Sequence, residues 1–228
     1  MGIRRIIAAL LCMMALAASG RAQCACDVFV QKWNFFASRE IDDALAARMM
    51  GRSYPEDCPV PLSDLRCLNI LYYNFDGVVC SGELVCNASV ADDLLDIFIA
   101  LYDAGYRLRS VRLVDEFGAD DNLSMAADNT SCFNWRRVPG TGRISAHAYG
   151  LAVDINPLEN PYVRKGGVLP PEGAAYADRS RDFEHKIDPE DLCFKLFRSK
   201  GFTWGGFWRS QKDYQHFELR NAVRGQTK

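Results

Sequence analysis

Apolar and polar residues alternate along the chain from residue 65 onwards. The stretch "LRCLNILYYNF" is typical of a strand, and Asp76-Gly77 after it indicates a turn. The following "VVCSGELVC" then predicts the return strand of a hairpin.

Three segments have the spacing of three and four between apolar residues that is typical of a helix. The first is "VFVQKWNFFASREIDDALAARMM", and the second covers residues 90–101 and stops before Gly105. The third, "DPEDLCFKLFRSKG", ends at Gly201. Glycine commonly follows the last turn of a helix, so these two ends are well defined.

The rest of the chain predicts short strands and long connections. Strand character is found in "YRLRSVRLV", "CFNWRRV", "LAVDIN" and "YQHFELR", and residues 115–131 and 157–188 interrupt it. Connections of this length are uncommon unless they have a function. Because strands and helices do not alternate regularly, we expect an α+β fold with an antiparallel sheet.

The N-terminal sequence "MGIRRIIAALLCMMALAASGRAQ" has the pattern of a secretory signal peptide. A basic start precedes an apolar run of 13 residues, Ile6 to Ala18, and Gly20 and Ala22 occupy the −3 and −1 positions of a cleavage site. Residues 1–22 therefore predict export to the periplasm or cell envelope, or out of the cell. An uncleaved N-terminal anchor is the alternative.

Composition narrows the class of protein further. We expect a lead-in segment at residues 23–64, one main domain at 65–228, and no stable membrane insertion after cleavage, because no later stretch is long and apolar enough. A net charge of −2 gives no reason to expect nucleic acid as a partner. Of nine cysteines, eight lie outside the apolar run, and an even number in an exported protein predicts disulfides of undetermined connectivity.

The candidate chemistry lies in two stretches, "SAHAYGLAVD" and "KDYQHFE". They contain His147, Asp154, Asp213 and His216, which are two imidazoles and two carboxylates. A hydrolytic zinc site needs three protein ligands and one open position, and two histidines with one aspartate supply this set. By spacing alone, histidines that only form structural hydrogen bonds are an equal alternative.

The two acids differ in their surroundings. Asp154 lies in the apolar stretch "LAVDI", where a carboxylate is costly to bury unless it binds a metal. Asp213 lies in a polar turn three residues before His216, from which it can reach a water molecule without binding the metal. We therefore interpret Asp154 as a ligand and Asp213 as the general base.

Together the two stretches resemble the D-alanyl-D-alanine carboxypeptidase and L-alanyl-D-glutamate endopeptidase family of zinc peptidases. The family pattern S-x-H-x-x-G-x-A-x-D followed by D/E-x-x-H is matched by Ser145, His147, Gly150, Ala152, Asp154, Asp213 and His216. The resemblance extends over roughly residues 62–220. It implies one zinc ion bound by His147, Asp154 and His216, with Asp213 as catalytic base. It also implies a small antiparallel sheet with flanking helices and the zinc site at the rims of sheet and loops, so residues 65–228 become a catalytic domain.

The resemblance assigns one further residue, and the sequence offers several other candidates. Arg136 matches an arginine near the scissile carbonyl, where it either stabilises the oxyanion or binds a substrate carboxylate. Ser145 either binds substrate or holds the turn. Trp204, Trp208 and Tyr149 line a cleft or belong to the core. We expect His185 to be structural.

The resemblance predicts an exported zinc metallopeptidase that acts on peptidoglycan stem peptides. A D-Ala-D-Ala carboxypeptidase and an L-Ala-D-Glu endopeptidase share these motifs, so the bond cleaved stays open, as does the oligomeric state. The alternative is a non-catalytic cell-wall-binding protein that keeps the fold and a structural zinc. A serine hydrolase using Ser145 and His147 is disfavoured, because no orienting acid or nucleophile elbow accompanies them.

Overall fold

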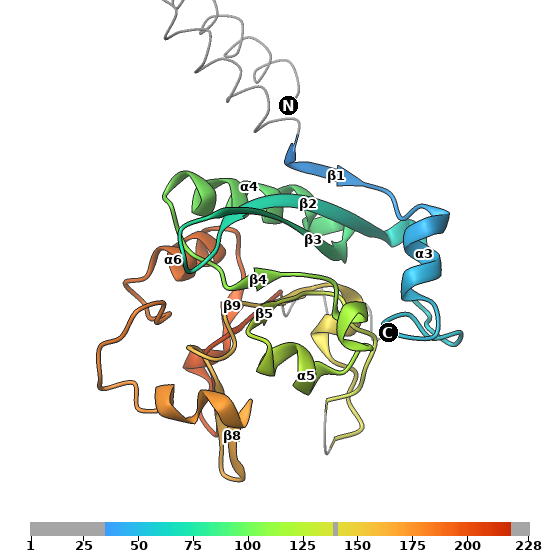
Figure 1. Ribbon diagram of the computed structural model, residues 1–228. Coiled ribbons are helices and arrows are strands. Elements are labelled where there is room, and N and C mark those ends of the chain that lie inside the picture. Colours follow the sequence, from blue (N-terminus) through green and yellow to red (C-terminus); the bar gives the residue numbers. More distant parts are fainter. Residues whose placement is uncertain (1–34, 139–140, 220–228) are drawn as a thin grey trace, which may run out of the picture.

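The structure is a computed structural model that describes residues 35–138 and 141–219. These residues form three antiparallel sheets of three strands each, one parallel pair of strands and four α-helices, together with short 3-10 helices (Figure 1). The predicted α+β class, with small antiparallel sheets and flanking helices, is confirmed.

The first sheet is built on the predicted hairpin. Its order is β1 (Ala37–Arg39), β2 (Leu65–Tyr73) and β3 (Val79–Asn87). Helix α4 (Ala91–Asp103) packs against β2 through its buried face, as Figure 1 shows. The apolar residues of this helix recur at three and four, so one side of it is buried and the other faces solvent.

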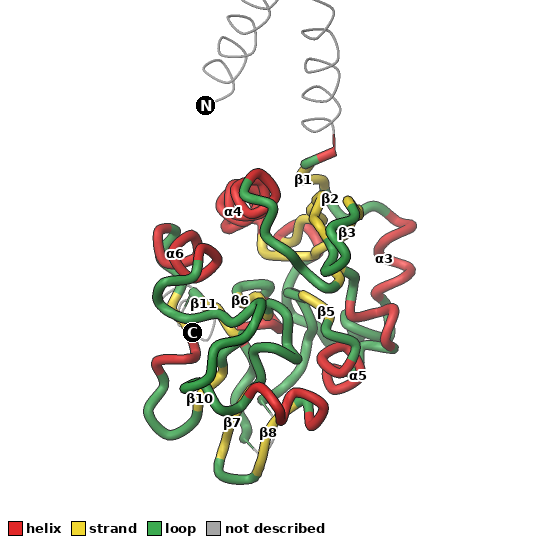
Figure 2. Tube along the Cα trace, turned by 60° about the vertical axis from the view of Figure 1, so that its left-hand side comes forward, coloured by secondary structure: helices red, strands yellow, loops and turns green. Residues whose placement is uncertain are grey.

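Two further sheets carry the C-terminal half of the chain. One has the order β6 (Ala152–Asp154), β11 (His216–Glu218) and β9 (Thr203–Trp204). The other has the order β10 (Lys212–Asp213), β7 (Tyr162–Arg164) and β8 (Gly167–Leu169), and its β7–β8 hairpin lies at the opposite end of the molecule from β1–β3 (Figure 2). Helix α6 (Leu192–Ser199) contacts β9 and α4.

For two stretches the strand prediction is wrong over most of the length. In "YRLRSVRLV" only β4 (Ser110–Val111) forms, and it pairs in parallel with β5 (Asn129–Thr130). In "CFNWRRV" no ladder forms, because successive backbone N–H groups bond to separate parts of the chain: Phe133 to Val85, Asn134 to His147 and Trp135 to Ser53. An alternating pattern does not reveal that its hydrogen bonds go to several partners.

The helix predicted in the lead-in segment is shorter than its pattern. Residues 37–39 form β1 on the edge of the first sheet, and α3 covers only Asp43–Met49. Asp42 starts this helix by accepting a hydrogen bond from Leu45 N at 2.8 Å. The long connection at 115–131 is also ordered locally, since it contains η3 (Val114–Phe117) and α5 (Asp121–Ala126).

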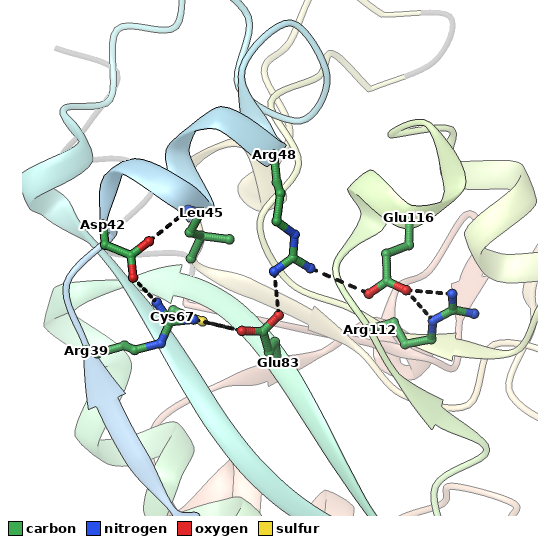
Figure 3. A network of polar contacts seen from close by, with 8 residues as sticks. All are labelled: Arg39, Asp42, Leu45, Arg48, Cys67, Glu83, Arg112 and Glu116. Atoms are coloured by element: carbon green, nitrogen blue, oxygen red, sulfur yellow. Dashed lines mark hydrogen bonds and ion pairs between the residues drawn. The ribbon is translucent and has the colours of Figure 1, made fainter.

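Charged side chains join the lead-in elements to the first sheet (Figure 3). Glu83 of β3 accepts from Arg39 of β1 at 2.7 Å and from Arg48 of α3 at 2.9 Å. Arg48 also lies 3.8 Å from Glu116, which pairs with Arg112 at 2.6 Å. Because these pairs are partly exposed, each contributes only about 0–1 kcal/mol, and their main effect is to orient the elements that they connect.

The expected disulfides are not confirmed within the described residues. Cys58, Cys67, Cys80, Cys86, Cys132 and Cys193 all have free thiols. Four of them are buried and pack as small apolar residues. Burial raises the pKa of Cys67 to about 11, which keeps its thiol protonated.

Cys24, Cys26 and the predicted signal peptide lie outside the described residues. Within the part that the structure describes, no helix combines the length and the apolar composition needed to cross a membrane.

Candidate active site

His147 lies on a tight 3-10 turn, η4 (Ala146–Tyr149), between the 132–138 segment and β6. Ser145 caps this turn, and its hydroxyl accepts a hydrogen bond from His147 N at 3.3 Å. Gly150 ends the turn at a φ of +66°, and a Cβ there would lie 2.5 Å from Asn87 N. Only glycine allows the turn to pack this closely against the end of β3.

Three side chains meet at the end of the β6–β11 pair. Asp154 and His216 are direct partners in the antiparallel register, and His216 Nδ1 lies 3.0 Å from Asp154 Oδ1. His147 Nε2 reaches the same place from η4, 3.2 Å from Asp154 Oδ2 and 3.2 Å from His216 Nδ1. All three side chains are buried.

The geometry of this cluster fits a metal ion. Its three ligand atoms lie within 4.8 Å of one another. In a tetrahedral zinc site with bonds of about 2.0–2.1 Å, neighbouring ligand atoms are separated by about 3.3 Å, close to the separations found here. His147 Nδ1 donates to the carbonyl of Cys132 at 2.6 Å, so Nε2 presents its lone pair to the cluster.

The electrostatics of the cluster also favour a positive charge between its members. Burial by itself lowers the pKa of His216, but hydrogen bonds to Asp154 and Glu218 raise it above its usual value. Burial raises the pKa of Asp154, and the charges and hydrogen bonds of His147 and His216 outweigh this and hold it well below its usual range. Two imidazoles and one carboxylate are therefore arranged to share a cation.

Glu218 is a member of this site that the sequence analysis missed. Its Oε2 lies 3.4 Å from His216 Nε2, on the far side of the ring from Asp154. A carboxylate there keeps the proton of His216 on Nε2, so that Nδ1 faces the cluster. The signal in the sequence is its position two residues after His216 on the same strand, which places both side chains on one face.

Asp213 lies beside the cluster on β10. Its Oδ1 is buried and has no hydrogen-bond partner among the described residues. Burial, with a further contribution from the charge of Asp154, raises the pKa of Asp213 to about 7, and His216 and Arg136 oppose this. β10 packs closely against the backbone at Gly205. A Cβ at this position would lie 2.5 Å from Asp213 O, so only glycine allows the close packing.

Arg136 lies near Asp213 and is held by an acid that the sequence analysis did not select. Its Nη2 pairs with Asp121 Oδ2 of α5 at 2.7 Å. The carbonyl of Arg136 accepts from Ser145 N at 3.1 Å, which ties it to the turn that carries His147. Ser145 thus holds the turn in this structure, and its substrate contact stays a prediction.

The remaining candidates divide between site and core. The ring of Trp208 lies 5.3 Å from that of His216. Trp204 and Tyr149 are buried members of the hydrophobic core. His185 lies outside the cluster and stacks on Phe75 with ring centres 3.8 Å apart. A cavity of about 560 Å³ is lined partly by aromatic and basic residues but by none of the cluster residues; its lining includes Arg179, Lys186, Trp204, Phe207, Lys212 and Tyr214.

An α+β fold with a buried His–Asp–His cluster and an adjacent carboxylate is typical of metal-dependent hydrolases. Residues 139–219 match the family described as D-alanyl-D-alanine carboxypeptidase. The resemblance inferred from the motifs is therefore confirmed for this segment. The match contains all three cluster residues and Asp213, and it begins after Arg136. No solved structure matches the chain.

Proposed function

We propose that the protein is an exported zinc metallopeptidase that hydrolyses peptide bonds in the stem peptides of peptidoglycan. The convergence of His147 Nε2, His216 Nδ1 and the Asp154 carboxylate at 3.0–3.2 Å carries this proposal. The family match over residues 139–219 supports the substrate class. Export rests on the signal-peptide pattern of residues 1–22.

The side chains divide the chemistry among them. His147, Asp154 and His216 would hold the zinc ion, which would supply Lewis acidity for a carbonyl oxygen and for water at near-neutral pH. Asp213, buried beside the cluster with an Oδ1 that has no partner among the described residues, would accept the proton of the attacking water and return it to the leaving amine. The guanidinium of Arg136 stabilises negative charge on the scissile carbonyl oxygen or binds a substrate carboxylate.

Digestion of purified peptidoglycan, with and without a chelator, tests the proposal. We expect cleavage that the chelator abolishes and that added zinc restores. The masses of the released muropeptides identify the bond, since loss of a terminal D-Ala marks a carboxypeptidase and separation of L-Ala from D-Glu marks an endopeptidase. Binding to peptidoglycan without cleavage would instead support the non-catalytic alternative.

Two substitutions separate the roles of the acids. Asp213→Ala removes a group that contacts only the water, so it should keep zinc and lower the rate by about 10²–10⁴-fold. Asp154→Ala removes a ligand, so zinc and activity should be lost together. Zinc content and peptide cleavage are measured on both, with Asp178→Ala, an exposed acid that bonds to Ser180, as the control. If Asp213→Ala loses the metal while Asp154→Ala keeps it, the two roles are reversed.

A further inference from the structure

We propose that Asp121 is a positioning residue for the reaction: it holds the guanidinium of Arg136 so that the buried Nε–H is directed at an oxygen atom of the bound peptide. This inference rests on the proposed peptidase function. Asp121 lies within the stretch that resembles the family, but it is not a position of the signature pattern, and the family match begins only at residue 139.

The first observation is the geometry of the ion pair. Arg136 Nη2 lies 2.7 Å from Asp121 Oδ2, and both side chains are mostly buried, with 22% and 24% of their surface exposed. Arg136 Nε is buried and has no hydrogen-bond partner among the described residues. One donor of this guanidinium is therefore held by protein, and a second is left for another acceptor.

The shape of the guanidinium explains how one contact directs the other. The group is planar and rigid, and its Nε–H and one Nη2–H lie along the same edge. When Asp121 fixes Nη2, the plane and the direction of Nε–H are fixed as well. A buried donor without an acceptor is unfavourable, so a site that keeps one open is suited to a ligand that supplies the acceptor.

The second observation is that backbone hydrogen bonds tie the segment that carries Arg136 to the turn that carries His147. Asn134 N donates to the carbonyl of His147, and Ser145 N donates to the carbonyl of Arg136, each at 3.1 Å. The segment that carries Arg136 is thus bonded on both sides of its side chain to the turn that carries His147. With the backbone of Arg136 held in this way, the position of its guanidinium depends on the conformation of the side chain. The ion pair with Asp121 fixes that conformation.

The third observation is that α5 is fixed to the same region. Asp120 caps this helix and accepts from Asn122 N and Leu123 N. Just before the helix, the carbonyl of Ala119 accepts from Asn134 Nδ2 at 3.3 Å. This hydrogen bond ties the backbone two residues before Asp121 to the segment that carries Arg136. At the other end of α5, Gln215 Nε2 lies 3.3 Å from Met125 Sδ and links the helix to the residue before His216.

A double-mutant cycle on stem-peptide cleavage tests the inference. Asp121→Ala is expected to lower kcat/KM by about tenfold or more, and the loss should come from the same change, a lower kcat or a higher KM, as in Arg136→Ala. In the Arg136→Ala background, Asp121→Ala should have less than about a twofold further effect, because it acts only through that arginine. Asp121→Glu should restore part of the activity. Glu190→Gln, an exposed acid that pairs with Lys195, is the control for loss of one negative charge.

Zinc content and melting temperature are measured on every variant. The inference requires that Asp121→Ala keeps its zinc. Wild-type activity in Asp121→Ala, an equal loss in both backgrounds, or loss of zinc would each overturn the role of Asp121. Absence of cleavage by the wild-type protein would instead overturn the proposed function and this inference with it.

Discussion

Asp128 and Glu159 form a buried pair of carboxyl groups that is separate from the His147–Asp154–His216 cluster. Asp128 Oδ1 accepts from Leu158 N, and the carboxyl groups of Asp128 and Glu159 hydrogen-bond to each other. Arg109 lies 3.7 Å from Asp128 and offsets only one negative charge. Burial, with the charge of Asp128, raises the pKa of Glu159 from its usual 4.5 to about 8, so the pair shares a proton at neutral pH.

This pair is expected to destabilise the fold as the pH rises from mildly acidic values to about 8. The pKa of Glu159 is higher in the folded than in the unfolded protein, so stability falls as pH rises from about 4.5 through about 8. Glu159→Gln removes this dependence. The free energy of unfolding of the variant, relative to that of wild type, should therefore be more favourable at pH 9 than at pH 5 by on the order of 1–3 kcal/mol. Urea unfolding at both pH values measures it, with exposed Glu190→Gln as control. An unchanged difference between wild type and Glu159→Gln at the two pH values would contradict the prediction.

At the scale of elements, the η4 turn determines where His147 lies. A substitution at Gly150 should therefore change the geometry of the His147–Asp154–His216 cluster indirectly, by shifting the turn. In Gly150→Ala the new Cβ would meet the backbone of Asn87 at 2.5 Å, and the left-handed φ adds strain of about 1 kcal/mol or more.

We expect Gly150→Ala to shift the turn, weaken zinc binding and lower the melting temperature. Gly105→Ala is a matched control, because Gly105 also has a left-handed φ, +67°, and its Cβ would meet nothing within 4 Å. Zinc competition with a chelator and thermal unfolding are compared for the two variants. Equal zinc affinity in both would show that η4 does not position His147 as described.

For the whole molecule, the question is how much the lead-in segment contributes to stability. Leu45 of α3 is 2% exposed and belongs to the main hydrophobic core, although it precedes the expected domain start at residue 65. Leu45→Ala should therefore cost about 2–5 kcal/mol, the usual range for a buried leucine. Leu123→Ala, at a residue that is 58% exposed, should cost little. Urea unfolding measures both, and a near-zero effect at Leu45 would mean that the core does not depend on the lead-in segment.

Patterns that arise from local physics could be predicted from the sequence. The β2–β3 hairpin and α4 follow from periodicity and glycine positions, because their hydrogen bonds are between near neighbours in the chain. The candidate residues His147, Asp154, Asp213 and His216 were predicted from their types and spacing together with the resemblance of their motifs to a known family. These features need no knowledge of distant contacts.

Only the tertiary structure decided which distant groups meet. His147 and His216 are 69 positions apart, and the cluster forms because β6 and β11 pair in one register. The same long-range packing brings Asp121 to Arg136, and it divides the hydrogen bonds of "CFNWRRV" among three parts of the chain. Such contacts depend on packing between segments that carry no local signal of one another, so periodicity and residue type could supply the candidates but not their partners.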